Sequence, residues 1–123
     1  MPLEIVAEPS NPSMVALAGR LDSTTAPELE AVLDRVLKNA PLPRFVFDLS
    51  RLEYLSSAGI RCFMRARKVI ERAGGRVAIV NPQPAVRKVL DIVKAIPAGG
   101  IFKDVAELDA YLDEMQKQVR DRD

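Results

Sequence analysis

The spacing of hydrophobic and polar residues changes several times along the chain, and the first changes predict β-strands. The runs Leu3–Ala7 and Met14–Leu21 are rich in strand-forming residues, and a turn-like stretch of Pro, Ser and Asn at 9–13 separates them. We therefore expect a β-hairpin at the start of the chain. Phe45–Phe47 is a short run that is apolar on both faces, which is typical of a central strand, and Val77–Val80 predicts another short buried strand.

Four further segments repeat apolar residues at the three- and four-residue spacing of α-helices. The expected helices are 26–38, one capped by Ser56 or Ser57 and stopped by Gly74-Gly75, one opened by Pro84, and one over 105–119. Between the central strand and the second helix, residues 50–55 are expected to form a loop.

Two of these helices are preceded by a capping box, in which a capping residue is followed three positions later by Glu. The pairs are Thr25 with Glu28 and Asp104 with Glu107. We also expect a short edge strand at Ile101–Phe102, which would be the last strand of the sheet.

The order of these elements predicts the fold class. Strands separated by helices pair in parallel through right-handed crossovers. We therefore expect a single α/β domain over residues 1–119, with a four- to five-stranded mixed sheet, helices mainly on one face and a disordered tail at 120–123. The predicted core residues are Leu29, Val32, Leu33, Phe45, Phe47, Ile60, Phe63, Met64, Val77, Ile79, Val89 and Leu112.

Composition excludes several functional classes. The 18 Lys and Arg residues against 17 Asp and Glu leave a formal charge of +1, which argues against a broad surface for nucleic acid or anionic lipid. The chain has no histidine, so Ser-His-Asp and Cys-His nucleophile pairs and the usual zinc and iron sites are excluded. We expect neither a cofactor nor a bound metal.

Cellular location is inferred from the cysteine content and from hydropathy. The single cysteine, Cys62, lies among apolar residues and is expected to be buried and unpaired, as in a reducing compartment. No apolar run approaches the roughly 18 residues that span a bilayer, and the first ten residues lack the features of a signal peptide. A cytoplasmic protein without membrane insertion is the expectation.

Functional residues of α/β folds gather beyond the carboxyl ends of the parallel strands, so we examined the loops there. Asp48 follows the central strand, as does the phosphate acceptor of response-regulator receivers, but the acidic pair and the supported lysine that such an acceptor needs are missing. Asp48 is therefore expected to accept hydrogen bonds from nearby amides. The Gly74-Gly75 and Gly99-Gly100 pairs lack a phosphate-loop motif and predict turns.

Two other segments carry adjacent hydroxyl groups, and together they resemble a known family. Phe45-Val-Phe-Asp-Leu-Ser-Arg-Leu-Glu-Tyr-Leu-Ser-Ser-Ala-Gly-Ile60, with Gly19-Arg-Leu-Asp-Ser-Thr-Thr-Ala26 upstream, is similar to the STAS domain of anti-sigma factor antagonists. The resemblance covers nearly the whole chain, including element order and length. It implies a STAS-like single domain.

The resemblance also implies site residues. The phosphorylated serine of the family corresponds to Ser57, the family glycine to Gly59, and the acidic residue of the upstream loop to Asp22. The chain departs from the family at Ser56, where Asp is common, which leaves Ser56 as an alternative acceptor. The implied partner-binding residues are Asp22, Ser23, Thr24, Ser56, Ser57, Ala58 and Gly59.

By this resemblance, the chain is a phosphorylation-switched binding module and not an enzyme. Its implied partners are an anti-sigma factor that is also a serine protein kinase, and a serine phosphatase; binding would release a sigma factor, and phosphorylation would end it. Direct nucleic-acid binding is not expected. The alternative is a STAS subunit or scaffold of a lipid-transport, anion-transport or stress-signalling complex.

The stability of the phosphorylated form can be argued from helix physics. A phosphate on Ser57 would lie at the amino terminus of a helix, where free backbone amides favour negative charge by about 0.3 to 1 kcal/mol. We therefore expect the fold to survive phosphorylation, and the change to act on the partner interface.

Overall fold

The computed structural model describes residues 3–8, 13–38, 44–95 and 105–122. Within these residues the strands are β1 Glu4–Glu8, β2 Ser13–Leu21, β3 Arg44–Leu55 and β4 Arg76–Val80. They form one sheet in the order β1-β2-β3-β4. β1 and β2 are antiparallel, whereas β2 with β3 and β3 with β4 are parallel. The expected hairpin and the parallel crossovers are confirmed.

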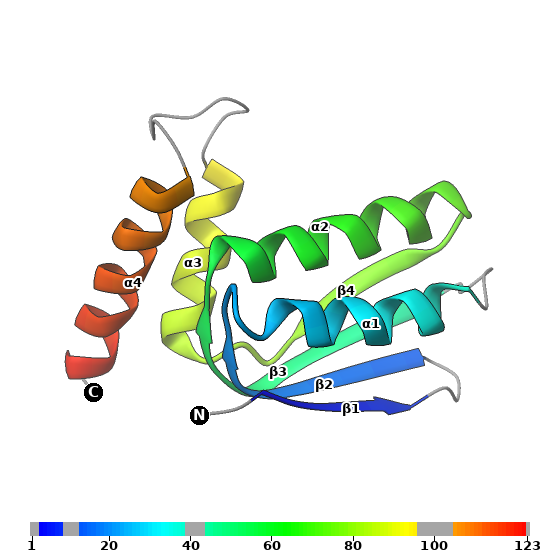
Figure 1. Cartoon of the computed structure of the whole chain (residues 1–123), viewed down its shortest axis with the longest axis horizontal. Helices are drawn as coiled ribbons and strands as arrows, with labels where there is room; N and C mark the ends of the chain where they lie inside the picture. Colours follow the sequence, from blue (N-terminus) through cyan, green and yellow to red (C-terminus); the bar gives the residue numbers. More distant parts are fainter. Residues whose placement is uncertain (1–2, 9–12, 39–43, 96–104, 123) are drawn as a thin grey trace.

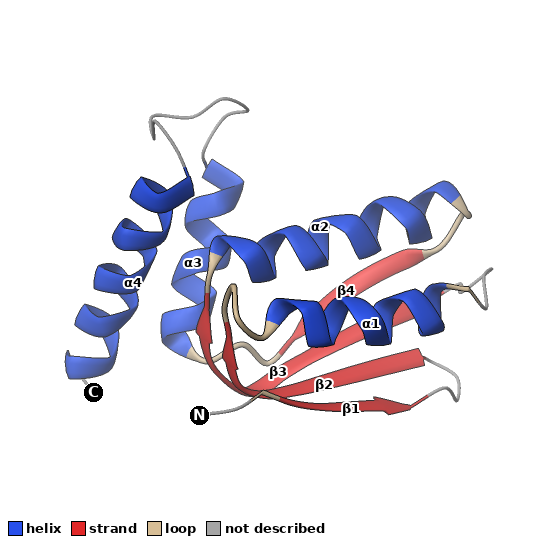
Figure 2. Cartoon of the chain, viewed as in Figure 1, coloured by secondary structure: helices blue, strands red, loops and turns tan. Residues whose placement is uncertain are grey.

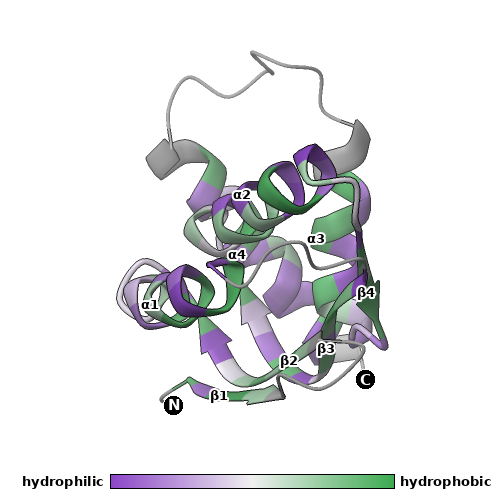
Figure 3. Ribbon diagram, turned by 90° about the vertical axis from the view of Figure 1, so that its right-hand side faces the viewer, coloured by the Kyte–Doolittle hydropathy of each residue, from purple (hydrophilic) through white to green (hydrophobic). Residues whose placement is uncertain are grey.

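Two pairs of helices accompany the sheet (Figures 1 and 2). α1 and α2 lie side by side over one face, and Figure 3 shows both of them above the strands. α3 and α4 pack against each other at the end of the sheet where β3 rises into α2. The helices are α1 Ala26–Leu37, α2 Ser57–Arg72, α3 Pro84–Ala95 and α4 Val105–Arg122. α4 continues beyond residue 119, so the helix includes most of the segment expected to be a disordered tail.

The core lies between the sheet and the layer of α1 and α2, as the periodicity predicts. Most of the predicted core residues are buried, but Met64 is 60% exposed and Ile79 is 36% exposed. Met64 follows the buried Phe63, so on α2 it lies about 100° around the helix axis from that residue. Ile79 lies on β4, which among the described residues pairs with β3 alone. Val32 and Val77 are only partly buried.

The predicted loop at residues 50–55 is wrong, because β3 continues to Leu55. Two register shifts against β2 interrupt the regular alternation of this strand: Ala16 pairs with Asp48 but Ala18 with Arg51, and a second shift follows Gly19. Each shift inserts one additional residue in β3, as in a β-bulge, and bulges bend a strand. The bend turns the ends of β2 and β3 upward, toward the starts of α1 and α2 (Figure 1).

The first bulge is stabilised by side chains at Ser50. The Ser50 N–H donates to Asp48 Oδ1 at 3.0 Å, and the Ser50 carbonyl accepts from Gln83 Nε2 at 2.9 Å. A bulged residue loses its ladder partners, and here side chains replace both of them. Asp48 therefore has the structural role expected for it, as an acceptor of a backbone amide.

The capping boxes have mixed outcomes. Thr25 occupies the N-cap position of α1 as predicted, but its side chain makes no capping hydrogen bond. Instead its hydroxyl donates to the Arg20 carbonyl at 2.8 Å and accepts from the Asp22 N–H at 3.0 Å. The second box, Asp104 with Glu107, and the strand at Ile101–Phe102 lie outside the described residues and side chains.

Candidate functional site

The bent ends of β2 and β3 bring the two hydroxyl-rich segments together. The Ser56 N–H donates to the Leu21 carbonyl at 2.9 Å, which joins the end of β3 to the end of β2. We call Asp22–Thr25 the Asp22 loop and Ser56–Gly59 the acceptor segment. Although these segments are separated by more than thirty residues in the sequence, they start α1 and α2 at the same end of the sheet.

The Asp22 loop is organised by its own side chains. Asp22 Oδ1 accepts hydrogen bonds from the backbone N–H groups of Thr24 at 3.0 Å and Thr25 at 3.1 Å. Its other carboxylate oxygen lies 3.8 Å from Arg20 Nε. Ser23 and Thr24 are exposed. Asp22 therefore shapes the loop, and the residues that a partner can reach are Ser23 and Thr24.

Gly59 is required by the close approach of α2 to the strand ends. A Cβ atom at this position would lie 2.6 Å from Leu21 Cγ and 2.6 Å from Leu55 Cδ1. Both neighbours are fully buried and so have little room to move. The glycine thus allows α2 to begin directly against the core, and this places Ser57 beside the Asp22 loop.

The two serines of the acceptor segment are buried. Ser56 is 4% exposed and Ser57 is 5% exposed. Ser56 is the N-cap of α2, as the sequence predicted, but its side chain makes no capping hydrogen bond. Within the described residues, neither hydroxyl oxygen has a hydrogen-bond partner. Two buried, unpartnered hydroxyls in adjacent positions are unusual, because burying a polar group without a partner is unfavourable.

An aspartate of α4 occupies the amino terminus of α2. The Ser57 N–H donates to Asp109 Oδ1 at 2.9 Å. A carboxylate here is favoured by the helix dipole, by about 0.3 to 1 kcal/mol. The expectation that the α2 amides are free is therefore wrong for Ser57, since this amide already binds an anionic group.

A glutamine of α4 binds the end of β3. Gln116 is 1% exposed, and its Oε1 accepts from the Leu55 N–H at 2.9 Å while its Nε2 donates to the Leu55 carbonyl at 2.8 Å. The side-chain amide thus pairs with the strand as another backbone would. The same Nε2 also donates to the Leu112 carbonyl at 3.1 Å.

A third polar contact involves Tyr54. Burial, and next the negative charge of Asp113 with its hydrogen bond, raise the pKa of the Tyr54 hydroxyl to about 12. The guanidinium of Arg20 lies over the Tyr54 ring, 3.9 Å from its centroid, and acts in the opposite direction. Tyr54 is therefore neutral at physiological pH and links β2, β3 and α4.

Sequence reasoning missed the α4 residues of this site. Asp109, Asp113 and Gln116 are spaced i, i+4 and i+7, which places them along one side of a helix. Leu112 and Met115, both buried, lie between them in the sequence. This row of polar residues beside an apolar stripe is the sequence feature that could have indicated a buried polar contact. It does not identify the strand or helix that these residues contact.

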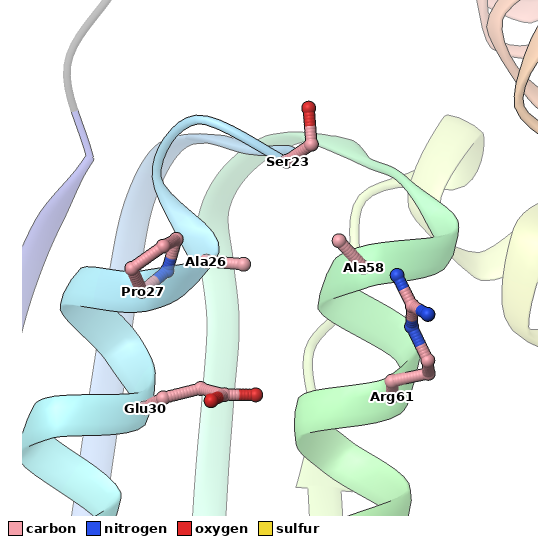
Figure 4. Close-up of a pocket in the computed structure, with 6 residues that line it drawn as sticks. All are labelled: Ser23, Ala26, Pro27, Glu30, Ala58 and Arg61. Carbon is pink, nitrogen blue, oxygen red and sulfur yellow. The ribbon is translucent and has the colours of Figure 1, made fainter.

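A groove of about 360 Å³ opens between the first turns of α1 and α2 (Figure 4). Glu30 of α1 and Arg61 of α2 face it from opposite helices. The remaining lining residues are Ser23, Ala26, Pro27 and Ala58. The groove thus joins exposed residues of the Asp22 loop with Ala58 of the acceptor segment.

Cys62 lies behind this groove and is buried and unpaired, as expected. Burial, and next the neighbouring carboxylate of Glu30, raise the pKa of the Cys62 thiol to about 11. A thiol with a raised pKa is a poor nucleophile and a poor metal ligand at neutral pH.

Across the four described ranges, no cluster of three or more Asp, Glu or Cys side chains could hold a metal ion. Each helix in these ranges also falls short of the length and apolar character required of a membrane-spanning helix.

The mixed sheet, the helix pair on one face and the serines at the start of α2 define a single-domain α/β protein of one recognisable type. Residues 4–108 match the model of the STAS domain family, and the chain belongs to that family. The chain is 27% identical over 90 residues to the anti-sigma F factor antagonist of Paenibacillus polymyxa, covering 73% of this chain and 72% of that protein. It is 34% identical over 79 residues to BtrV of Bordetella bronchiseptica, covering 64% and 67% of the two chains.

Solved structures agree with this fold. The unphosphorylated form of the anti-sigma factor antagonist SpoIIAA superposes with a TM-score of 0.65 at 22% identity, over 74% of this chain and 81% of that one. An anti-sigma factor antagonist from Mycobacterium paratuberculosis superposes with a TM-score of 0.67 at 24% identity, over 96% and 94% of the two chains.

Proposed function

We propose that this protein is an anti-sigma factor antagonist that works in the cytoplasm and is switched by phosphorylation of Ser57. The main support is the position of Ser57 at the first turn of α2, directly after the hydrogen bond from Ser56 to Leu21 that joins the end of β3 to the strand end before the Asp22 loop. The names of the related proteins point the same way. In this proposal the unphosphorylated form binds an anti-sigma factor that is also a serine kinase, and a serine phosphatase reverses the modification.

The partner surface proposed here is the Asp22 loop with the acceptor segment and the groove between α1 and α2. Ser23 and Thr24 are exposed, and Ala58 lines the groove. Glu30 and Arg61 give the groove charges of both signs, so a partner with polar side chains fits it better than a purely apolar one.

The switch would act through charge. A phosphate adds roughly −1.5 to −2 charges at neutral pH. Ser57 already lies beside the carboxylate of Asp109, and the Asp22 carboxylate is in the adjoining loop. An acidic or apolar partner surface would then face desolvation and like-charge repulsion, which weaken an interface by several kcal/mol.

In this proposal the chain itself has no catalytic role, in line with a family whose members are generally not enzymes. The chain supplies the acceptor hydroxyl, and the partner kinase supplies ATP and the catalytic base.

Phosphosite mapping tests the acceptor. The tagged chain is used to isolate its kinase partner from the native cell, and the purified pair is incubated with ATP. Mass spectrometry is expected to find phosphate on Ser57, and Ser57→Ala is expected to abolish incorporation while Ser56→Ala retains it. Phosphate on Ser56 alone, or equal labelling of the wild type and Ser57→Ala, would contradict the assignment.

A further inference from the structure

The helix α4 contacts the chain at the junction between the end of β3 and the start of α2. Gln116 pairs with both backbone groups of Leu55, Asp109 accepts the Ser57 N–H, and the charge of Asp113 helps to raise the pKa of the Tyr54 hydroxyl. These contacts come from three successive turns of one helix. They hold α4 to the junction of β3 and α2 by polar groups, in addition to the buried Leu112 and Met115.

This docking is incompatible with phosphoryl transfer to Ser57. The Ser57 hydroxyl oxygen is completely buried and has no partner among the described residues. For transfer, this oxygen must attack the γ-phosphorus of ATP in line with the bond to ADP, while its proton passes to a base of the kinase. A kinase active site therefore needs the hydroxyl exposed, and the α4 group that binds the same residue is Asp109, at the Ser57 backbone N–H.

The phosphorylated form is also incompatible with the same contact. The phosphate on Ser57 and the Asp109 carboxylate would compete for the N–H groups at the first turn of α2, where only one anionic group fits well. Two anions at hydrogen-bond distance from one helix terminus repel each other strongly in a partly buried setting. Gln116 is neutral, so the repulsion acts on α4 through Asp109.

We propose that α4 is a latch over the acceptor segment, closed by Asp109 and Gln116 in the unphosphorylated protein and displaced when Ser57 carries a phosphate. Opening of the latch exposes Ser57 to the kinase, and expulsion of Asp109 keeps α4 undocked afterwards. The detached α4 would change the surface beside the partner site, in addition to the local charge. This inference rests on the proposed function, because it assumes that Ser57 is the acceptor.

Hydrogen exchange measured by mass spectrometry tests the latch without any kinase. Phosphoserine is placed at position 57 during translation by an expanded genetic code, and at the exposed Ser50 of β3 as the matched control. We expect phosphoserine at 57 to raise the exchange rate of α4 amides at least tenfold and to leave β2 and β3 amides unchanged. Phosphoserine at 50 should leave α4 unchanged.

A second variant tests the role of Asp109 directly. Asp109→Asn removes the negative charge, and its side-chain NH₂ can donate to the phosphate. In this background, phosphoserine at 57 is expected to leave α4 protected, whereas the exposed control substitution Asp121→Asn should leave α4 detached as in the parent. Loss of helix packing alone would not be rescued by a single neutral amide.

Three outcomes would overturn the latch: unchanged α4 exchange with phosphoserine at 57, faster exchange of the whole sheet together with α4, or no rescue by Asp109→Asn. None of them depends on which kinase acts. Phosphosite mapping tests the acceptor and hydrogen exchange tests the latch, so failure of one proposal can be told apart from failure of the other.

Discussion

At the scale of single residues, Gly59 shows how closely the site depends on packing. Its position is limited by space, since a Cβ would meet Leu21 and Leu55 at 2.6 Å. Gly74 has the opposite constraint: nothing lies within 4 Å of an added Cβ, but its φ is +89°. The two glycines of α2 and its turn are therefore needed for different physical reasons.

These constraints predict different substitution effects. Gly59→Ala forces Leu21 or Leu55 off its rotamer and is expected to lower the free energy of unfolding by about 1 to 3 kcal/mol in urea titrations. Gly74→Asn, the control, should cost under about 0.5 kcal/mol, because Asn tolerates positive φ and the space is open. A Gly59→Ala protein as stable as the wild type would contradict the close approach of α2 to the strand ends.

Tyr54 gives a prediction of pH dependence. Its pKa of about 12 in the folded protein lies above the ordinary tyrosine pKa of 10.0, so the folded state holds the hydroxyl proton more tightly than the unfolded chain. The resulting stabilisation is complete below pH 10 and is lost as the pH rises toward 12. Chemical denaturation from pH 9 to 11.5 should show a smaller loss of stability in Tyr54→Phe than in the wild type. Identical pH profiles for Tyr54→Phe and the wild type would count against the burial of this hydroxyl.

At the scale of elements, one contribution to the docking of α4 comes from a buried side-chain amide, that of Gln116. Gln116→Ala leaves the N–H and carbonyl of Leu55 without their side-chain partner, and is expected to lower the free energy of unfolding by about 1 to 3 kcal/mol. Gln118→Ala, on the exposed side of the same helix, should change it by less than about 0.5 kcal/mol. Equal effects of the two substitutions in thermal or urea unfolding would argue against this pairing.

The elements also show where sequence reasoning works and where it stops. The helices α1 and α2 and the hairpin can be predicted from the spacing of apolar residues alone. Each of these elements buries one face, and this fixes the period at which apolar residues recur. The sequence predicts too short a strand for β3, because the bulges near Ser50 and Glu53 break the alternation of apolar and polar residues on which strand prediction relies. Its extension is stabilised by pairing with β2, a contact distant in sequence.

At the scale of the whole molecule, the family resemblance located the two segments that the fold brings together. Asp22 follows β2, and Ser57 and Gly59 begin α2 after β3, so these motif positions lie at one end of the sheet. The burial of Ser57 and its contact with α4 could not be predicted, since no motif links Asp109 to the start of α2 or Gln116 to the end of β3. The family explains the sheet and the acceptor segment, whereas the covering of Ser57 depends on tertiary packing that only the structure shows.

The central claim is that a phosphate on Ser57 ends partner binding without unfolding the protein. Isothermal titration calorimetry of the anti-sigma factor kinase against the unphosphorylated chain and the chain with phosphoserine at 57 tests it most directly, with phosphoserine at 50 as the control. We expect at least tenfold weaker binding with phosphoserine at 57, a loss of about 1.4 kcal/mol or more, with unchanged binding for the control and a folded sheet in all three. Equal affinities for the unphosphorylated protein and the protein with phosphoserine at 57 would contradict the account.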